Sequence, residues 1–306
     1  MGSRVAVLLC VYDGKDYLRE QIDSVLNQTH KDLVIWVSND GDDPATEAIL
    51  AEYQTRLLPG TLTVVAGPRK GFAANFLSLV NRGDITADYY AFCDQDDIWE
   101  PEKIERALER LSGAAPHEPA LYGGRTCLID EEGNEIGLSP LFKKRPSFRN
   151  ALVQNIAGGN TMVFNHAAKI LLAGVGETKV VSHDWWAYLL ISGAGGLVIY
   201  DPVPAIRYRQ HDANLIGANM SSRARMARLS LLLKNRFREW SQVNIDALDA
   251  ARDVLSPENR ALLDTFEKLR RASFVMRFVY FTKARLYRQT FLGNMALILA
   301  VLLRKV

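Results

Sequence analysis

The apolar run Val5-Ala6-Val7-Leu8-Leu9-Cys10-Val11 decides the predicted fold of this chain. A strand without polar alternation is typical of a parallel sheet covered by helices on both faces. Residues 16–28 follow with apolar side chains at helical spacing, and a second apolar run at 33–38 ends in a polar turn. The chain is therefore expected to begin with a strand, a helix and a second strand.

The alternation of strand and helix continues beyond this start. We predict helices at 46–56 and 72–81, and strands at 62–65, 89–93, 120–124, 126–130 and 197–200. Residues 143–150 look like a loop. This order predicts an α/β fold with a mostly parallel, Rossmann-like sheet flanked by helices, whose ligands bind at the carboxyl ends of the strands.

The sequence changes character after about residue 215, where arginine-rich helices follow. We predict an α/β domain at 1–217 and a basic, helical C-terminal region at 218–306, with its helices beginning near Ser221. From residue 268 to 306 there are nine Lys or Arg and no Asp or Glu, so the +2 charge of the whole chain leaves −7 for residues 1–267. A basic tail interleaved with Phe and Leu suits an anionic membrane surface, whereas the acidic remainder argues against nucleic acid.

The predicted location follows from the tail and the cysteines. The apolar stretch 291–303 is shorter than the ~20 residues that span a bilayer, so we expect attachment to the membrane surface. The alternative is that the tail packs on the α/β domain or on a second copy of the chain. Three isolated cysteines and a short apolar start followed by charges indicate neither disulfides nor an export signal. The chain is expected in the cytoplasm, peripheral on the inner face of the membrane.

The acidic cluster Asp94-Gln95-Asp96-Asp97 follows the predicted strand 89–93. It precedes Ile98-Trp99-Glu100-Pro101, which we interpret as a helix start with Pro101 in the first turn. Three carboxylates at the end of a buried strand would repel one another and lose hydration, so they indicate a bound divalent cation. Such a cation can hold a diphosphate, which makes the chain a candidate enzyme for a nucleotide-linked substrate.

Two further groups follow predicted strands. Asp40, in the turn at 38–43, can accept a hydrogen bond from the ring N–H of uracil or thymine; the alternative is an Asx turn with helix capping. Arg69 and Lys70 can meet phosphate oxygens, or form a solvated charge pair.

Two groups of residues in the second half of the α/β domain are also candidates for catalysis or ligand binding. His183-Asp184-Trp185-Trp186 has the composition of a sugar site, because aromatic faces stack on a pyranose while a carboxylate accepts a hydroxyl proton. The alternative is a helix cap beside core tryptophans. Arg209 can clamp a diphosphate, and His211 can supply a nitrogen ligand to the same cation or serve a structural role.

In this order the segments resemble the inverting glycosyltransferases of family 2, which have a GT-A fold. The resemblance covers roughly residues 4–217 and rests on the strand and loop at 7–14, the helix end at 24–29, the turn at 38–42 and the D-x-D at 94–97. Within the family, 94–99, 183–186 and 208–211 look most like bacterial rhamnosyltransferases that build cell-surface polysaccharides. Asn39 departs from an Asp that is common there. The Q-x-x-R-W pattern of processive synthases is missing, which favours addition of one sugar or a few.

The resemblance implies roles for Cys10, Tyr12, Asp40, Asp94, Asp96 and Asp184, and the chemistry of the other candidate residues predicts theirs. Asp184 would be the catalytic base; the donor would be bound by Cys10, Tyr12, Asp40, Arg69, Lys70, Asp94, Gln95 and Arg209. Mg²⁺ or Mn²⁺ would be held by Asp96, Asp94 and His211. The acceptor would meet Gly159, Asn160, His183, Trp185 and Trp186.

The reaction expected from this resemblance is transfer of rhamnose from dTDP-rhamnose to a hydroxyl of a lipid-linked saccharide. UDP-hexoses are the second choice of donor. Two other classes stay open, namely a sugar nucleotidyltransferase and a non-catalytic scaffold that binds a nucleotide sugar.

Overall fold

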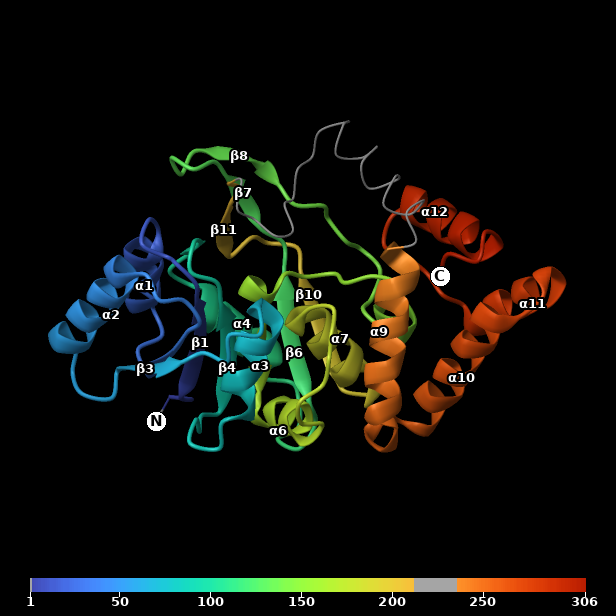
Figure 1. Cartoon of the computed structure of the whole chain (residues 1–306), viewed down its shortest axis with the longest axis horizontal. Coiled ribbons are helices and arrows are strands. Elements are labelled where there is room, and N and C mark those ends of the chain that lie inside the picture. The colour runs from blue at the N-terminus through green and yellow to red at the C-terminus, as the bar shows by residue number, and fades with distance from the viewer. Residues whose placement is uncertain (1, 212–235) are drawn as a thin grey trace.

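The computed structural model describes residues 2–211 and 236–306, which form an α/β body and a helical C-terminal region (Figure 1). The body is built on a seven-stranded sheet in the order β10-β6-β9-β4-β1-β2-β3. Its strands are β1 (Val5–Val11), β2 (Leu33–Asn39), β3 (Leu62–Ala66), β4 (Tyr89–Cys93), β6 (Ala120–Gly124), β9 (Val163–Asn165) and β10 (Leu197–Asp201).

The sheet is mostly parallel, as predicted. β1 pairs in parallel with β2 and β4, β2 with β3, and β6 with β10. The exception is β9, which lies antiparallel between β4 and β6. The parallel order brings the carboxyl ends of β1, β2 and β4 to one edge, where the predicted donor residues follow them.

Helices cover both faces of this sheet. They are α1 (Leu18–Leu26), α2 (Pro44–Arg56), α3 (Phe72–Asn81), α4 (Lys103–Leu111), α6 (His166–Gly174) and α7 (His183–Gly193). The apolar side chains of β1 alternate between two separate clusters, with Leu8 in one and Val7 in the other, and both are fully buried. This two-sided burial explains why the first strand contains no polar residue.

A smaller, four-stranded sheet contradicts one prediction. Its order is β5-β11-β7-β8, from β5 (Ile98–Trp99), β11 (Ile206–Arg209), β7 (Cys127–Ile129) and β8 (Glu135–Leu138). The predicted helix start at 98–101 is wrong, because Ile98 and Trp99 pair with β11 and the helix α4 begins only at Lys103, after Pro101. Two short elements, α5 (Phe148–Ala151) and η1 (Gly159–Thr161), complete the body, and α5 ends the predicted loop at 143–150 in a single helical turn.

The C-terminal region is helical, as predicted. It contains α9 (Arg236–Ala250), η2 (Arg252–Val254), α10 (Pro257–Arg271), α11 (Phe274–Ala284) and α12 (Phe291–Leu302). The predicted boundary at 217/218 and the helix start near Ser221 lie outside the described residues. Within the described ranges, no helix combines the length and apolarity that crossing a membrane requires.

Candidate active site

The candidate site lies where β1, β2 and β4 end. Asp40 follows β2, and the acidic cluster 94–97 follows β4. Burial raises the pKa of the Cys10 thiol well above its ordinary value, and the charges of Asp94 and Asp40 raise it further. Cys10 lies opposite Ser38 in the β1–β2 pairing, and Ser38 comes two residues before Asp40.

Asp40 is buried beneath the turn that follows β3. Its Oδ1 accepts a hydrogen bond from the backbone N–H of Arg69 at 2.5 Å, and its own N–H donates to the carbonyl oxygen of Val11 at 2.8 Å. Gly67 permits this packing, since a Cβ there would lie 2.4 Å from Asp40 Oδ1. The side chains of Arg69 and Lys70 are exposed at the rim, with Lys70 Nζ 3.3 Å from Glu177 Oε2.

Gln95, predicted to bind the donor, uses its amide to hold the loop after β1. Its Nε2 donates to the carbonyl oxygen of Tyr12 at 2.9 Å, and its Oε1 accepts from the Tyr12 N–H at 2.7 Å. It packs against Gly14, where a Cβ would lie 2.6 Å from Oε1. Tyr12 itself is 64% exposed.

Asp97 is fixed from two sides within the protein. Its Oδ2 accepts a hydrogen bond from Asn160 Nδ2 at 2.5 Å, and its Oδ1 accepts from the backbone N–H of Arg209 at 3.1 Å. Burial raises the pKa of Asp97 well above its ordinary value, and the charges of Asp96 and Asp94 add to this. Asn160, predicted at the acceptor, therefore anchors the acidic cluster.

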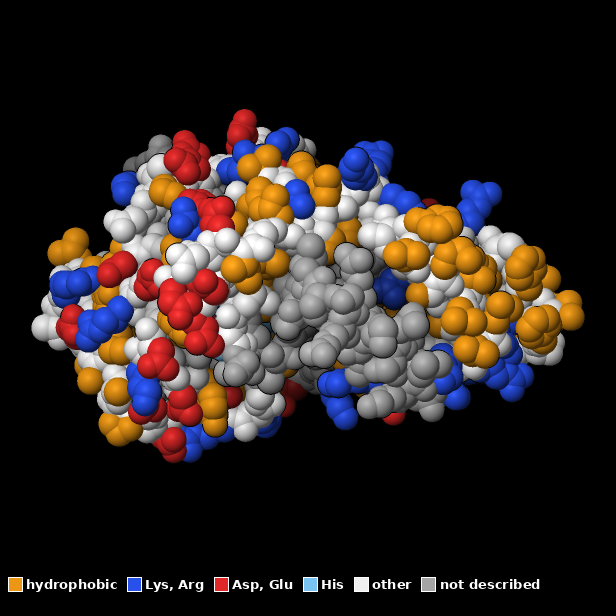
Figure 2. All heavy atoms as spheres, turned by 90° about the horizontal axis from the view of Figure 1, so that it is seen from above, with side chains coloured by type: hydrophobic (Ala, Val, Ile, Leu, Met, Phe, Trp, Pro, Cys, Tyr) orange, Lys and Arg blue, Asp and Glu red, His pale blue; other side chains and the backbone are white. Residues whose placement is uncertain are grey.

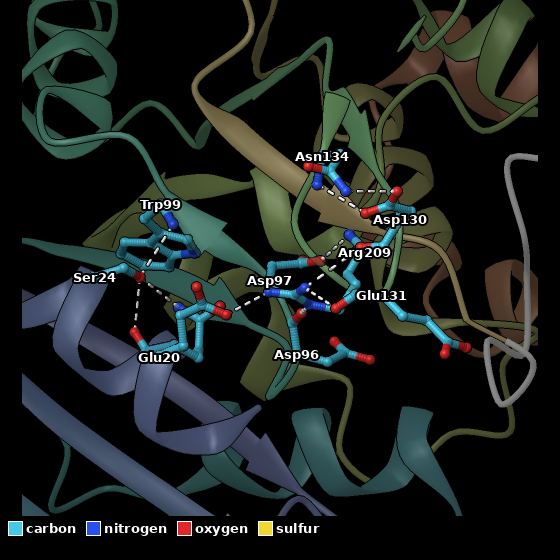
Figure 3. A network of polar contacts seen from close by, with 10 residues as sticks. Glu20, Ser24, Asp96, Asp97, Trp99, Asp130, Glu131, Asn134 and Arg209 are labelled. Carbon is cyan, nitrogen blue, oxygen red and sulfur yellow. Dashed lines mark hydrogen bonds and ion pairs between the residues drawn. The ribbon is translucent and has the colours of Figure 1, made fainter. Parts of the chain in front are cut away.

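Arg209, which is predicted to clamp a diphosphate, contacts protein oxygens in the structure. It is 2% exposed and reaches from β11 across the cluster towards α1 (Figure 3). Its Nε donates to the carbonyl oxygen of Asp96 at 3.1 Å, one terminal nitrogen donates to that of Glu131 at 2.6 Å, and the other pairs with Glu20. In the structure the guanidinium supports the backbone that carries Asp96, because its donors are directed at protein oxygens.

The structure brings two of the three predicted metal ligands together. His211 Nε2 lies 2.8 Å from Asp96 Oδ2, and the His211 ring stacks on Tyr17 with centroids 5.6 Å apart. Burial raises the pKa of Asp94 to about 8, with the charges of Asp96 and Asp184 as further causes. The charges of Asp96 and Asp184 thus both act on the carboxyl group of Asp94.

These side chains suit a divalent cation whose remaining coordination positions are filled by water and substrate phosphates. In residues 2–211 and 236–306 no group of three His, Cys, Asp or Glu side chains is assembled as a metal cluster. Mg²⁺ is usually bound through one or two carboxylates together with water and substrate phosphates, so Asp96 with His211 beside it is a fitting partial set.

Asp184, the predicted base, lies in the first turn of α7. Its Oδ1 accepts from the backbone N–H of Trp185 at 2.6 Å, and its Oδ2 accepts from Asn155 Nδ2 at 2.9 Å. Only 9% of Asp184 is exposed. The carboxylate is thus held in one orientation near Asp94.

The tryptophans that follow Asp184 lie in the core. Trp185 and Trp186 are 6% and 1% exposed, and Trp185 Nε1 donates to the carbonyl oxygen of Ala151 at 2.7 Å. Both rings pack in the core because every residue of α7 is buried. Their burial matches the alternative of core tryptophans and leaves neither ring a free face on which to stack a sugar, as the prediction of an acceptor site requires.

His183 is likewise part of the core. Its ring stacks on Phe76 with centroids 3.8 Å apart, and it meets the ring of Phe92 edge-on. Burial lowers the pKa of His183 to about 4, so the ring is neutral at neutral pH. A Cβ on Gly159 would lie 2.2 Å from His183 Nε2. Gly159, predicted at the acceptor, is the residue that makes room for this ring.

Three residues of the site carry no sequence signal. Asn155 fixes Asp184, and Glu20 of α1 pairs with Arg209 of β11. Lys103 is buried with its Nζ 3.5 Å from the centroid of the Trp99 ring, and burial lowers its pKa to about 7. Only the fold brings each of these residues to its partner.

Comparison with known proteins assigns this chain to a family. The sequence profile of "Glycosyl transferase family 2" matches residues 6–171. The "dTDP-rhamnosyl transferase RfbG" of Shigella flexneri is 26% identical over 244 residues, which cover 76% of this chain and 81% of that protein.

Solved structures share the fold. A mannosyltransferase of Pyrobaculum calidifontis, in complex with GDP-Man and Mn²⁺, superposes with a TM-score of 0.51 at 18% identity over 99% of this chain and 88% of its own. S. aureus TarS 1-349, in complex with UDP-GlcNAc, gives 0.53 at 13% identity over 85% of this chain and 86% of its own. At these identities the likeness shows the GT-A-like fold alone.

Proposed function

This chain belongs to glycosyl transferase family 2, and from that premise we propose an inverting, metal-dependent transfer of rhamnose with Asp184 as general base. The coarser activity, that of a nucleotide-sugar-dependent glycosyltransferase, follows from the family and the shared fold. The observation that carries the finer proposal is the buried carboxylate of Asp184 in the first turn of α7, fixed by Asn155, whose charge also raises the pKa of Asp94.

The donor proposed is dTDP-rhamnose. The relative described as a dTDP-rhamnosyl transferase supports this choice over the UDP-hexoses. Asp40 is proposed to accept a hydrogen bond from the ring N–H of the pyrimidine, and Cys10 and Tyr12 to line the base pocket. The exposed Arg69 and Lys70 can approach the phosphates from the rim.

The nucleoside diphosphate that leaves the donor gains negative charge, which a nearby cation can stabilise. Asp96 and His211, with Asp94 nearby, would hold Mg²⁺ or Mn²⁺, and structures of the same fold that contain Mn²⁺ agree with such a dependence. When bound, the cation would neutralise the charge that develops on the departing nucleoside diphosphate. Arg209 acts indirectly, because it holds the backbone of Asp96 in place.

The chemistry at the acceptor rests on Asp184. Its carboxylate takes the proton of an acceptor hydroxyl while that oxygen forms a bond to the anomeric carbon and the bond from this carbon to the diphosphate oxygen breaks. A positioned base of this kind contributes about 10²- to 10⁴-fold in rate. Asn155 holds the orientation of this carboxylate, because its amide donates a hydrogen bond to Asp184 Oδ2.

The acceptor proposed is a saccharide carried on a lipid, as in cell-surface polysaccharide synthesis at the inner face of the membrane. A sugar nucleotidyltransferase is the less favoured alternative because the matching family transfers sugars. A non-catalytic scaffold would not require Asn155 to orient Asp184.

The donor assignment is tested by thermal unfolding in the presence of a panel of nucleotide sugars, with Mn²⁺, with Mg²⁺ or with a chelator. Ligands that bind the native state raise its apparent stability. We expect dTDP-rhamnose with metal to raise the unfolding temperature most. Stabilisation by another nucleotide sugar alone, or equal stabilisation under chelation, would contradict the donor or the metal respectively.

A further inference from the structure

Helices α11 and α12 expose a continuous set of apolar side chains at one end of the molecule (Figure 2). In that view, hydrophobic side chains gather over this end, whereas acidic side chains gather on the other half. We call this set the apolar face; its most exposed members are Phe274, Val275, Phe278, Phe291 and Leu292, each between 60% and 78% exposed. A patch of this kind marks an interaction surface.

The catalytic body does not use these side chains to hold the tail. The tail packs on the body through other residues: Arg149 donates to the carbonyl oxygen of Ala284 at 2.6 Å, Asn150 to that of Tyr287 at 2.9 Å, and Asn259 of α10 to that of Gly193 at 3.0 Å. Packing of the tail on the α/β domain therefore involves α9, α10 and the end of α11. The apolar face points away from these contacts and remains exposed.

The two helices present the apolar face as a formed surface. Arg277 of α11 is buried, and one terminal nitrogen donates to the carbonyl oxygen of Leu302 at 2.9 Å while the other donates to that of Ala272 at 2.9 Å. A guanidinium at the C-terminal end of α12 also complements the helix dipole. The side chains of the face therefore need no folding step before they meet a partner.

The charge around the apolar face has one sign. Residues 268–306 contain no Asp or Glu, and Lys268, Arg271, Lys283, Arg285 and Arg304 are exposed there. Lys268 and Arg271, with Ser273, Met276 and Tyr280, line an open groove of about 290 Å³ at the start of α11. Cations beside apolar side chains complement the two layers of an anionic membrane surface, its headgroups and its acyl chains.

We propose that the apolar face is a membrane-docking surface on which α11 and α12 lie in the plane of an anionic bilayer. The aromatic and aliphatic side chains enter the acyl boundary, and the basic side chains meet lipid phosphates. A second copy of the chain fits this surface less well, because a two-fold contact would oppose two basic rims. The acidic residues of the body are repelled by the same lipids, which orients the enzyme with its C-terminal end on the membrane. The inference does not depend on the sugar chemistry.

The test is flotation of the full chain with vesicles, without donor or acceptor. Vesicles of equal parts phosphatidylcholine and phosphatidylglycerol should carry the chain, and vesicles of phosphatidylcholine alone should carry much less. The double variant Phe278→Ser with Phe291→Ser should bind at least about tenfold more weakly, since two apolar side chains leave the lipid. Lys268→Gln with Arg271→Gln should weaken binding and its dependence on salt.

Matched controls come from the body. Leu58 is 80% exposed, so Leu58→Ser removes an equally exposed apolar side chain, and Lys31→Gln removes an exposed charge; both should bind vesicles like the wild type. Circular dichroism melting should show each variant folded. Failure of the wild type to float with the anionic vesicles would overturn the proposal. So would sedimentation equilibrium that shows a dimer which the Phe278→Ser, Phe291→Ser variant dissociates, since this would assign the face to a second copy.

Discussion

His211 Nε2 lies 2.8 Å from Asp96 Oδ2, which joins the residue just after β11 to the acidic cluster after β4. The two residues are 115 positions apart, and their approach depends on the pairing of β5 with β11 in the small sheet. Arg209, two positions before His211, donates to the backbone of Asp96 from the same strand. The end of β11 and the residues just after it thus supply both a candidate ligand, His211, and the support for its partner Asp96.

The first prediction concerns this pair. Asp96→Asn and His211→Ala should each weaken metal-dependent binding of a nucleoside diphosphate by at least about tenfold, because each removes a donor or its support. Asp84→Asn, which changes an exposed carboxylate before β4, should bind like the wild type. Calorimetric titration with and without Mn²⁺ measures the effect. Equal affinity of all three variants would show that the pair does not serve a metal.

The second prediction separates the geometry of Arg209 from its charge. Arg209→Lys keeps the charge but loses the fork that joins Glu20, Asp96 and Glu131, so we expect a loss of roughly 1–3 kcal/mol in the free energy of unfolding and weaker metal binding. Arg19→Lys alters an exposed pair with Glu52, and exposed pairs contribute about 0–1 kcal/mol. Urea unfolding of both variants provides the comparison, and similar losses in the two would contradict the role of Arg209.

The third prediction assigns Asn155 to the positioning of the base. Asn155→Ala removes the hydrogen bond to Asp184 Oδ2, so kcat should fall by about 10- to 100-fold while KM for the donor stays unchanged. Steady-state kinetics at varied donor concentration separates the two constants. A rise in KM with unchanged kcat would place Asn155 in donor binding instead.

The fourth prediction is a pH dependence of stability. Burial lowers the pKa of His183 from 6.5 to about 4, so between these values the unfolded chain binds a proton that the folded chain does not. Stability from this group is therefore present above pH 6.5 and lost as pH falls towards 4. His183→Phe should reduce the loss of unfolding free energy between pH 7 and pH 5 by on the order of 2 kcal/mol. Urea titrations at both pH values measure it; the same loss in variant and wild type would contradict the burial of a neutral ring.

Much of the fold follows from local pattern. β1 and β4 are continuous apolar runs because both faces of the sheet are covered, and α3 was predicted with the bounds that the structure has. Ile98 and Trp99 form a strand where the local pattern predicts a helix start, because their partner strand comes more than a hundred residues later. Pairing at that distance leaves no trace in the neighbouring residues.

The sequence names candidate residues for the site, but it does not show how each side chain is placed. Asp40, Asp96 and Asp184 come from strand or helix ends, where side chains reach ligands, and the topology brings these ends together. Trp186 and Arg209 share residue types with ligand-binding groups, but their burial depends on helices and loops packed around them. A sequence shows which side chain is present, whereas its direction is decided by packing.

The central claim is that Asp184 is the base in a metal-dependent sugar transfer, and the Asp184→Asn variant tests it most directly. Product formation from dTDP-rhamnose and a lipid-linked acceptor is measured together with calorimetric binding of the donor in the presence of Mn²⁺. The account predicts a fall in turnover of about 10²- to 10⁴-fold with donor affinity unchanged. Turnover equal to that of the wild type would contradict it.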